Sequence, residues 1–377
     1  MSETTAPDRL PGAVPAAPAT TMPVTMPTTL SAATAKAARG LSPNQRAWAR
    51  FKRNRLGYTS LWLFATLLLL ATLAELVSND KPFVARIEGQ LLFPIVSNPS
   101  ELSLGGDFFT PTDWKDPFIT QLLAKPGNWA LGAPNPHGAN STDYFSKLPP
   151  PAAPTAQNWL GTDDKGRDML ARLLYGFRVS IWFAIALTVT GTLIGIVMGA
   201  VMGYFGGKID LTLQRVLEVW GAVPELYLLI IFASIFEPSL GLLLALLSLW
   251  GWMHLSDYVR AEFLRNRSLE FVKAARALGL SNAQIIRRHV LPNSLTPVIT
   301  FLPFRMSGAI LALTSLDFLG LGVPASVPSL GELLQQGKAN LDAWWIIVPT
   351  FVLLTTTMLL LTFIGDSLRD AFDTRKS

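Results

Sequence analysis

Six long runs of apolar residues dominate the pattern along the chain. Each has at least about 17 residues, the lower end of the range that a transmembrane helix needs to cross the hydrocarbon of a bilayer. The runs are continuous and do not alternate with polar positions, which favours helices over the strands of a barrel. They cover residues 57–77, 179–207, 216–236, 240–256, 294–316 and 344–364. The sequence therefore predicts an all-α polytopic membrane protein with six transmembrane helices.

The segments between these runs define the predicted domains. Residues 1–45 are rich in Ala, Pro and Thr and lack an apolar run, so they are predicted to be a disordered cytoplasmic segment. Residues 46–77 are predicted to form the first helix with a basic anchor. Residues 78–178 form a long external insertion between the first two helices, and we expect strands or short helices and a contact surface in it. A five-helix core over 179–366 and a cytoplasmic tail over 367–377 complete the chain.

The positions of Lys and Arg predict the orientation of the helices. With both termini in the cytoplasm, most basic residues lie inside, and the short external loops contain only Lys338. The long external segment does not oppose this orientation, because such segments are translocated largely regardless of charge. A basic cluster precedes the first run and is interpreted as a topology anchor rather than a specific lipid-headgroup site. Its members are Arg46, Arg50, Lys52, Arg53 and Arg55.

Composition narrows the chemistry that the chain can perform. Half of the 377 residues are apolar and only 15% are charged, which is unusual for a soluble enzyme. The absence of Cys excludes a disulfide framework, thiolate catalysis and Cys-ligated metal centres. His137, His254 and His289 are dispersed, so we expect neither a metal site nor catalytic residues. Trp250 and Trp252, at the end of the fourth run, are expected to lie in an interfacial aromatic belt.

Residues 257–292 form the most informative polar segment. Residues 270–278 favour a helix, and Gly279 supplies the left-handed residue that ends one. Residues 281–284 fit a capping box, which starts a second helix that we expect to end at residues 291–292. The sequence thus predicts a short helix, a tight turn and another helix on the cytoplasmic side.

Six residues of this segment resemble the EAA loop found in the membrane permease subunits of ABC importers. They are Glu270, Ala274, Ala275, Gly279, Leu291 and Pro292. His289 stands where Ile is usual in the family. The resemblance implies that this loop couples the chain to a cytoplasmic ATPase, and the small Ala274 and Ala275 are expected to let the partner's groove approach the helix backbone.

Further motifs narrow the resemblance to the C-type subunits of dipeptide and oligopeptide permeases, and most closely to the Yej-type E subunits. The motifs lie at residues 158–168, 206–210, 318–322, 328–334 and 365–373. A Gly-Gly-Asp-Phe sequence in the long external insertion adds to the likeness. The resemblance extends over nearly the whole chain from about residue 46. It implies the type I permease fold of ABC importers.

The resemblance also implies a function and a set of partners. The chain would form half of the translocation pathway of an ATP-driven importer for peptides or peptide-like compounds, including those of the microcin C type. The implied partners are a homologous B-type permease subunit, a cytoplasmic ABC ATPase that binds ATP and Mg, and a periplasmic peptide-binding protein, with no nucleic acid. The implied location is the bacterial inner membrane. The sequence itself lacks a P-loop, so ATP hydrolysis is expected in another chain and no cofactor in this one.

Four glycines recur at every fourth residue along one face of the second predicted helix. They are Gly191, Gly195, Gly199 and Gly203. Small residues at this spacing let another helix approach closely, because lipid offers no hydrophobic drive and packing must supply the attraction. We therefore predict a helix-packing face here, which could also slide during transport.

Two charged residues lie deep inside predicted spans, whereas Glu75 and Glu218 lie near the ends of theirs and are expected to reach the interface. Glu225 and Arg305 each cost roughly 2.5–3.5 kcal/mol on membrane-insertion scales, so each needs a partner or water. Each lies near the middle of its run after a proline. We hypothesise that the two either pair or line the conduit together.

Two alternatives from other classes remain. An ion-driven secondary transporter or channel acting alone would need inverted repeats or a buried ion-coordinating cluster, and the sequence has no sign of either. A receptor or scaffold would use the spans only as a membrane anchor, and six helices are more than an anchor requires. Co-purification with an ATPase and substrate-stimulated ATP hydrolysis would separate these alternatives from an importer subunit.

Overall fold

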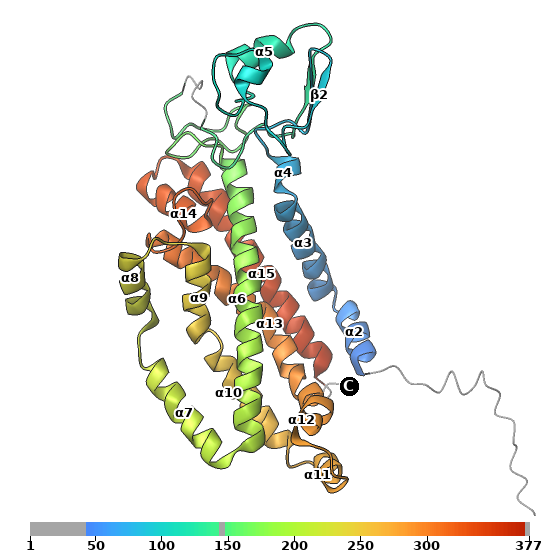
Figure 1. Cartoon of the computed structure of the whole chain (residues 1–377). Helices are drawn as coiled ribbons and strands as arrows, with labels where there is room; N and C mark the ends of the chain where they lie inside the picture. The colour runs from blue at the N-terminus through green and yellow to red at the C-terminus, as the bar shows by residue number, and fades with distance from the viewer. Residues whose placement is uncertain (1–42, 143–147, 374–377) are drawn as a thin grey trace, which may run out of the picture. The chain divides into compact units, whose positions relative to one another are not determined.

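The computed structural model describes residues 43–142 and 148–373 (Figure 1). Two units make up the chain, Met1–Gln45 and Arg46–Ser377, and nearly all described residues belong to the second. The predicted disorder of residues 1–45 falls outside the described residues, apart from residues 43–45. Those residues begin a helix, so the predicted boundary is too late by one helical turn.

The predicted membrane helices are present in the part of the chain that the structure describes. Five helices are long and apolar enough to cross a membrane, and a bent pair of helices, counted as one span, brings the number to six. In chain order they are α3 (Arg55–Thr72), α6 (Met169–Phe205), the bent pair α7 (Gly207–Gly221) and α8 (Glu225–Ile235), α9 (Leu240–Trp250) continued by α10 (Met253–Asn266), α13 (Leu291–Phe318) and α15 (Trp344–Phe372). The prediction of an all-α membrane protein with six spans is confirmed.

Shorter elements connect these helices. Around the first span lie α2 (Pro43–Arg53) and α4 (Ala74–Val77). Between α10 and α13 lie α11 (Glu270–Ala277), α12 (Asn282–Ile285) and a π-helical turn (Ile286–Val290), and α14 (Leu330–Ala339) precedes α15. The long insertion between the first two spans contains β1 (Val84–Ile87), β2 (Gln90–Leu92), a 3₁₀ turn (Glu101–Leu104), α5 (Pro117–Leu123) and β3 (Trp129–Leu131).

The third predicted helix is not a continuous rod. The run 216–236 is interrupted after Gly221, and the axes of α7 and α8 differ by 62°. Pro224 stands directly before α8, where its missing N–H and fixed ring end the preceding helix. Hydropathy misses this break because the residues around it are themselves apolar.

Several helices are longer than their apolar runs. α6 begins at Met169, ten residues before the predicted start at residue 179, because Asp168 caps it by accepting from the Ala171 N–H at 2.8 Å. α10 continues the fourth span from the predicted end at residue 256 to Asn266, and α15 continues to Phe372. An apolar run marks only the part of a helix that lies in lipid, so it underestimates helices that extend into water.

The main core lies between the helices of the membrane region. α3 packs against α15, and α13 packs against both α6 and α15. Apolar side chains from these helices and from α9 and α14 form one buried cluster, whose most fully buried members are Ala71, Ile181, Ala184, Ile310, Leu313 and Leu330. Packing between long helices therefore holds the membrane region together.

The long insertion between the first two spans has a small core of its own. Its three strands form an antiparallel sheet in the order β2-β1-β3, and α5 packs against it. Ala85 and Ile87 of β1 are buried with Trp114 and with Ile119 and Leu122 of α5. The expectation of strands and short helices in this segment is confirmed.

A buried ionic network joins the loop before α6 to α6 and α14. Glu332 of α14 accepts from Arg167 at 3.0 Å and from Lys165 at 3.2 Å, and it also pairs with Arg172 of α6. Asp163 pairs with Arg167 at 2.6 Å, while Arg172 is fully buried. Burial opposes the charge of Arg167, but the hydrogen bonds and charges of Asp163 and Glu332 outweigh it and raise the pKa of Arg167. The network thus fastens α14 to the start of α6.

We predict that Glu332→Gln destabilises the protein by roughly 3–5 kcal/mol, because it leaves the buried Arg172 charge without its partner. Heating the purified protein in detergent and following the loss of the monodisperse species measures the effect. Glu88→Gln is the matched control, since the Glu88–Lys125 pair is 3.8 Å long and exposed. Equal losses for both variants would contradict this role of the network.

Candidate functional site

The loop between α10 and α13 forms the predicted helix and turn. α11 begins at Glu270 and ends at Ala277, and Gly279 adopts a left-handed φ of 81°. Ser281 and Gln284 make the capping box that starts α12. These local predictions are confirmed.

The second helix does not end at Leu291-Pro292 as expected. It runs through the π-helical turn into α13, so that residues 282–318 form one helix of 37 residues. Pro292 is the second residue of α13 and follows directly after the π-helical turn. The helix therefore carries the loop directly into the fifth span.

The two faces of α11 differ sharply. Val272 is fully buried against the protein, whereas Leu278 is 80% exposed and Phe271 is 41% exposed. The Glu270 carboxylate is also exposed, and within the described part of the chain its ion-pair partner is Lys273 of its own helix, at 2.8 Å. The outer face thus presents apolar side chains together with the charged Glu270, Lys273 and Arg276 to water, a mixture that a docking surface can have.

One predicted feature of this face is wrong. Ala274 is exposed, but Ala275 is 5% exposed because it packs into the cluster beneath the loop. The packing within this chain therefore accounts for the small size of Ala275, because a larger side chain would push α11 away from the cluster beneath it. Only Ala274 remains available for the approach of a partner.

Apolar and polar contacts fix the loop to the membrane helices. Val272, Ala275 and Ile285 pack against Val259 and Phe263 of α10. Polar contacts add to this packing in three places: Tyr204 donates to Asn282 at 2.8 Å, Arg267 donates to the Tyr204 carbonyl at 3.1 Å, and Asn266 donates to Ser294 at 2.9 Å. The loop is thereby tied to α6, α10 and α13 at once.

The glycine face of α6 packs against α10. Its members are Gly191, Gly195, Gly199 and Gly203. A Cβ added at Gly195, Gly199 or Gly203 would lie between 2.5 and 3.0 Å from the nearest atom of α10 or of its N-cap Trp252. At Gly191 it would lie 3.2 Å from the carbonyl oxygen of Gly251. The absence of side chains on this face lets the two backbones come together.

A bidentate ion pair joins α7 to the same helix. Arg260 of α10 contacts the two carboxylate oxygens of Asp210 at 2.5 and 2.7 Å, and the Asp210 side chain is 9% exposed. Sequence reasoning did not identify this pair, although Asp210 belongs to the Gly-Gly-Lys-Ile-Asp motif. The charges lie 50 residues apart, and nothing local in the sequence marks them as partners.

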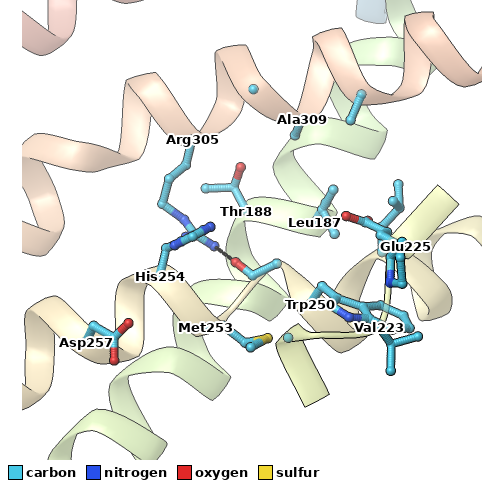
Figure 2. Close-up of a pocket in the computed structure, with 16 residues that line it drawn as sticks. Leu187, Thr188, Val223, Glu225, Trp250, Met253, His254, Asp257, Arg305 and Ala309 are labelled. Carbon is cyan, nitrogen blue, oxygen red and sulfur yellow. Dashed lines mark hydrogen bonds between the residues drawn. The ribbon is translucent and has the colours of Figure 1, made fainter. Parts of the chain in front are cut away.

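A cavity of about 580 Å³ lies at the amino-terminal end of α10, away from the loop that follows this helix (Figure 2). Glu225 enters it from the start of α8, and Arg305 from α13. Among the described residues no ion pair joins these two groups; instead Arg305 Nη2 donates to the Gly251 carbonyl at 2.8 Å. The structure thus puts both charges on one cavity without bringing them into contact.

Several polar atoms of this cavity lack partners. Arg305 Nε, Trp250 Nε1 and Thr188 Oγ1 are buried without a hydrogen bond. His254 and Asp257 of α10 also line the cavity. The Trp250 ring stacks on Trp220 at 5.5 Å and borders the cavity; its expected position in an interfacial belt stays a prediction. In the sequence, the sign of this cavity is the pair of polar residues His254 and Asp257 at the end of the fourth apolar run.

Comparisons with known proteins agree with this arrangement. A family model described as "Binding-protein-dependent transport system inner membrane component" matches residues 191–377. A second model, the N-terminal TM domain of oligopeptide transport permease C, matches residues 42–92.

Individual relatives match over most of the chain. The chain is 48% identical to the inner membrane ABC transporter permease protein YejE of Escherichia coli (strain K12), over 89% of this chain and 99% of that protein. It is 43% identical to the peptidoglycan transport system permease protein YejE of Agrobacterium fabrum, over 88% and 93% of the two chains. It is 34% identical to the dipeptide transport system permease protein DppC of Bacillus subtilis, over 58% and 69%.

We predict that Gly199→Ala destabilises the protein by about 1–3 kcal/mol, because the new Cβ would lie 2.5 Å from the Ser256 carbonyl oxygen. Gly241→Ala on α9 is the matched control, since its Cβ meets nothing within 4 Å and alanine favours a helix more than glycine does. In detergent, the midpoint of thermal unfolding should therefore fall for Gly199→Ala and should rise or stay the same for Gly241→Ala. A neutral Gly199→Ala would contradict the close packing of α6 on α10.

Proposed function

Because the chain belongs to the family of inner-membrane permease components of binding-protein-dependent ABC transport systems, we propose that it forms one half of a peptide-translocation pathway. In this proposal a homologous B-type permease supplies the other half, and a periplasmic binding protein delivers the peptide. A cytoplasmic ABC ATPase binds ATP and Mg and hydrolyses the nucleotide. The chain itself makes and breaks no covalent bond.

The single observation that supports coupling best is the structure of the loop between α10 and α13. Its outer face is apolar and exposed at Phe271 and Leu278, while its inner face is buried against α10 and α6. A partner seated on the outer face would therefore move helices rather than a flexible tail. In this proposal the contacts of the ATPase differ between two packings of the permease pair, and that difference drives transport.

The contacts near the two ends of the described chain support a common side for both termini. Arg50 of α2 donates to the carbonyl oxygens of Ala371 and Asp373, beyond the membrane part of α15, at 3.3 and 3.0 Å. An even number of spans, such as six, places both ends of a chain on the same side of a membrane. We assign that side to the cytoplasm because the basic cluster of α2 fits the positive-inside rule.

Relatives' names and the local chemistry support peptides as the substrate class. The names refer to peptidoglycan, dipeptide and oligopeptide transport. Peptide-like compounds of the microcin C type share the peptide backbone and fall within the same proposal. The polar, partly unsatisfied cavity beside α10 offers such a backbone hydrogen-bonding groups inside the membrane region.

The direct test is reconstitution of the assembled complex in liposomes. We expect the chain to co-purify with an ATPase subunit and peptide to stimulate ATP hydrolysis and enter the vesicles. Transport by the isolated chain, driven by an ion gradient without ATP, would instead support a secondary transporter and refute the proposal.

We predict that Gly279→Val lowers the number of peptides transported per ATP hydrolysed by roughly tenfold. Its φ of 81° lies in a region that a β-branched residue avoids, so the turn that shapes the loop would be strained. Gly279→Asn is the matched control, because Asn tolerates left-handed backbone and no atom lies within 4 Å of the Cβ position. Wild-type coupling in the valine variant, at normal assembly, would argue against this loop as the coupling element.

We also predict that Leu278→Asp releases the ATPase from the complex while assembly of the two permease subunits continues. A leucine that is 80% exposed here loses about 1.5–3 kcal/mol of apolar burial at an interface when it becomes charged. Val96→Asp, which changes an external residue that is 85% exposed, is the control and should retain the ATPase. Pull-down of the ATPase with each variant gives the answer, and equal retention would refute docking at α11.

A further inference from the structure

The cavity beside α10 presents opposite charges that do not neutralise each other. Glu225 makes no hydrogen bond or ion pair with another described residue, and Arg305 uses one amino group on the Gly251 carbonyl. Figure 2 shows the two side chains extending into the cavity from different elements, α8 and α13. Two charges held this way in a membrane protein are costly unless each meets a counter-charge or water.

Three further polar atoms in this cavity have no hydrogen-bond partner among the described residues. Near Arg305 and the α9–α10 break, Arg305 Nε and Trp250 Nε1 are buried donors without acceptors. Thr188 Oγ1 is a third buried atom without a partner in the same cavity. A ligand that fills this site must therefore offer acceptors, including a negative one for the guanidinium, and a cation for the Glu225 carboxylate.

A short peptide with free termini has this combination of groups. Its carboxylate matches the guanidinium, its ammonium matches the Glu225 carboxylate, and its backbone carbonyls suit the unpartnered donors. The volume of about 580 Å³ lies within the range of small-ligand sites. The apolar walls formed by Leu187, Leu247 and Ala309 leave room for side chains of varied kind without selecting among them.

We propose that this cavity is a transient binding site for the zwitterionic backbone of a short peptide, with Arg305 holding the terminal carboxylate and Glu225 the terminal ammonium. This proposal rests on peptide import as the function. It adds that the membrane subunit reads the peptide termini itself, in addition to any selection by a binding protein.

The location of the site connects it to the coupling loop. Arg305 binds the carbonyl of Gly251, which also faces Gly191 of the α6 packing face. Trp250, Met253 and His254 border the cavity at the start of α10, the helix whose other end leads to α11. Movement of α10 under the ATPase would thus change the shape of the site and release the peptide.

The experiment compares peptides with free and blocked termini in the reconstituted complex. Trialanine, N-acetyl-trialanine and trialanine amide are each bound to the binding protein beforehand, so that its own preference does not affect the comparison. Uptake into liposomes is then measured for the wild type, Glu225→Gln and Arg305→Gln. Glu237→Gln, at the other end of α8 and exposed, is the matched control.

The proposal predicts a crossed pattern. Blocking either terminus should slow wild-type uptake by roughly tenfold or more, the effect expected from losing one charge-assisted hydrogen bond. Glu225→Gln should no longer distinguish the acetylated peptide but should still discriminate against the amide, whereas Arg305→Gln should show the reverse. The control should resemble the wild type.

Other outcomes overturn the proposal in different ways. Equal wild-type uptake of all three peptides, or equal losses for every peptide in both variants, would mean that these charges serve the protein's own structure or hydration. No uptake of any peptide by the wild-type complex would instead refute the proposed function. The two failures are therefore distinguishable.

Discussion

The close contact between α6 and α10 is the constraint on which the other features of this protein depend. Four glycines remove the side chains from one face of α6, so the backbone of α10 lies directly against it. Lipid supplies no hydrophobic drive for such a contact, and complementary shape must supply the attraction. α10 is thereby held as a rigid element of 14 residues, about 20 Å long, along a longer helix.

The two ends of α10 lie at the two regions where function is expected. Its carboxyl end leads to the exposed loop that we propose as the ATPase contact, and its amino end borders the cavity that contains Glu225 and Arg305. Asp210 adds α7 to the same body through its pair with Arg260, whereas α8, beyond the 62° break, buries only Leu229. A rigid lever beside a loosely packed helix allows two packings of the pathway, and a partner that binds the two with different affinity can drive the change between them.

The parts of this structure that depend on neighbouring residues could be predicted, and the parts that depend on distant residues could not. Apolar runs gave the six spans, Gly279 gave the turn, and Ser281 with Gln284 gave the helix start, since each signal lies within a few residues. The break before α8 was missed because apolar residues surround Pro224. Ala275 was assigned to the outer face because the sequence does not show which side of α11 is buried. Glu332 and Arg167 are 165 residues apart, so their network has no local signature.

The most direct test of a rigid α6–α10 lever is a pair of spin-label distances in the assembled transporter, which the absence of native Cys makes possible with two introduced cysteines at a time. Labels at Val197 and Arg265 report on α6 against α10, and labels at Ile235 and Arg265 report on α8 against α10; all three positions are exposed. We expect the first distance to be the same without nucleotide and with ATP bound, while the second changes. A change in the Val197–Arg265 distance as large as that of the second pair would contradict the account.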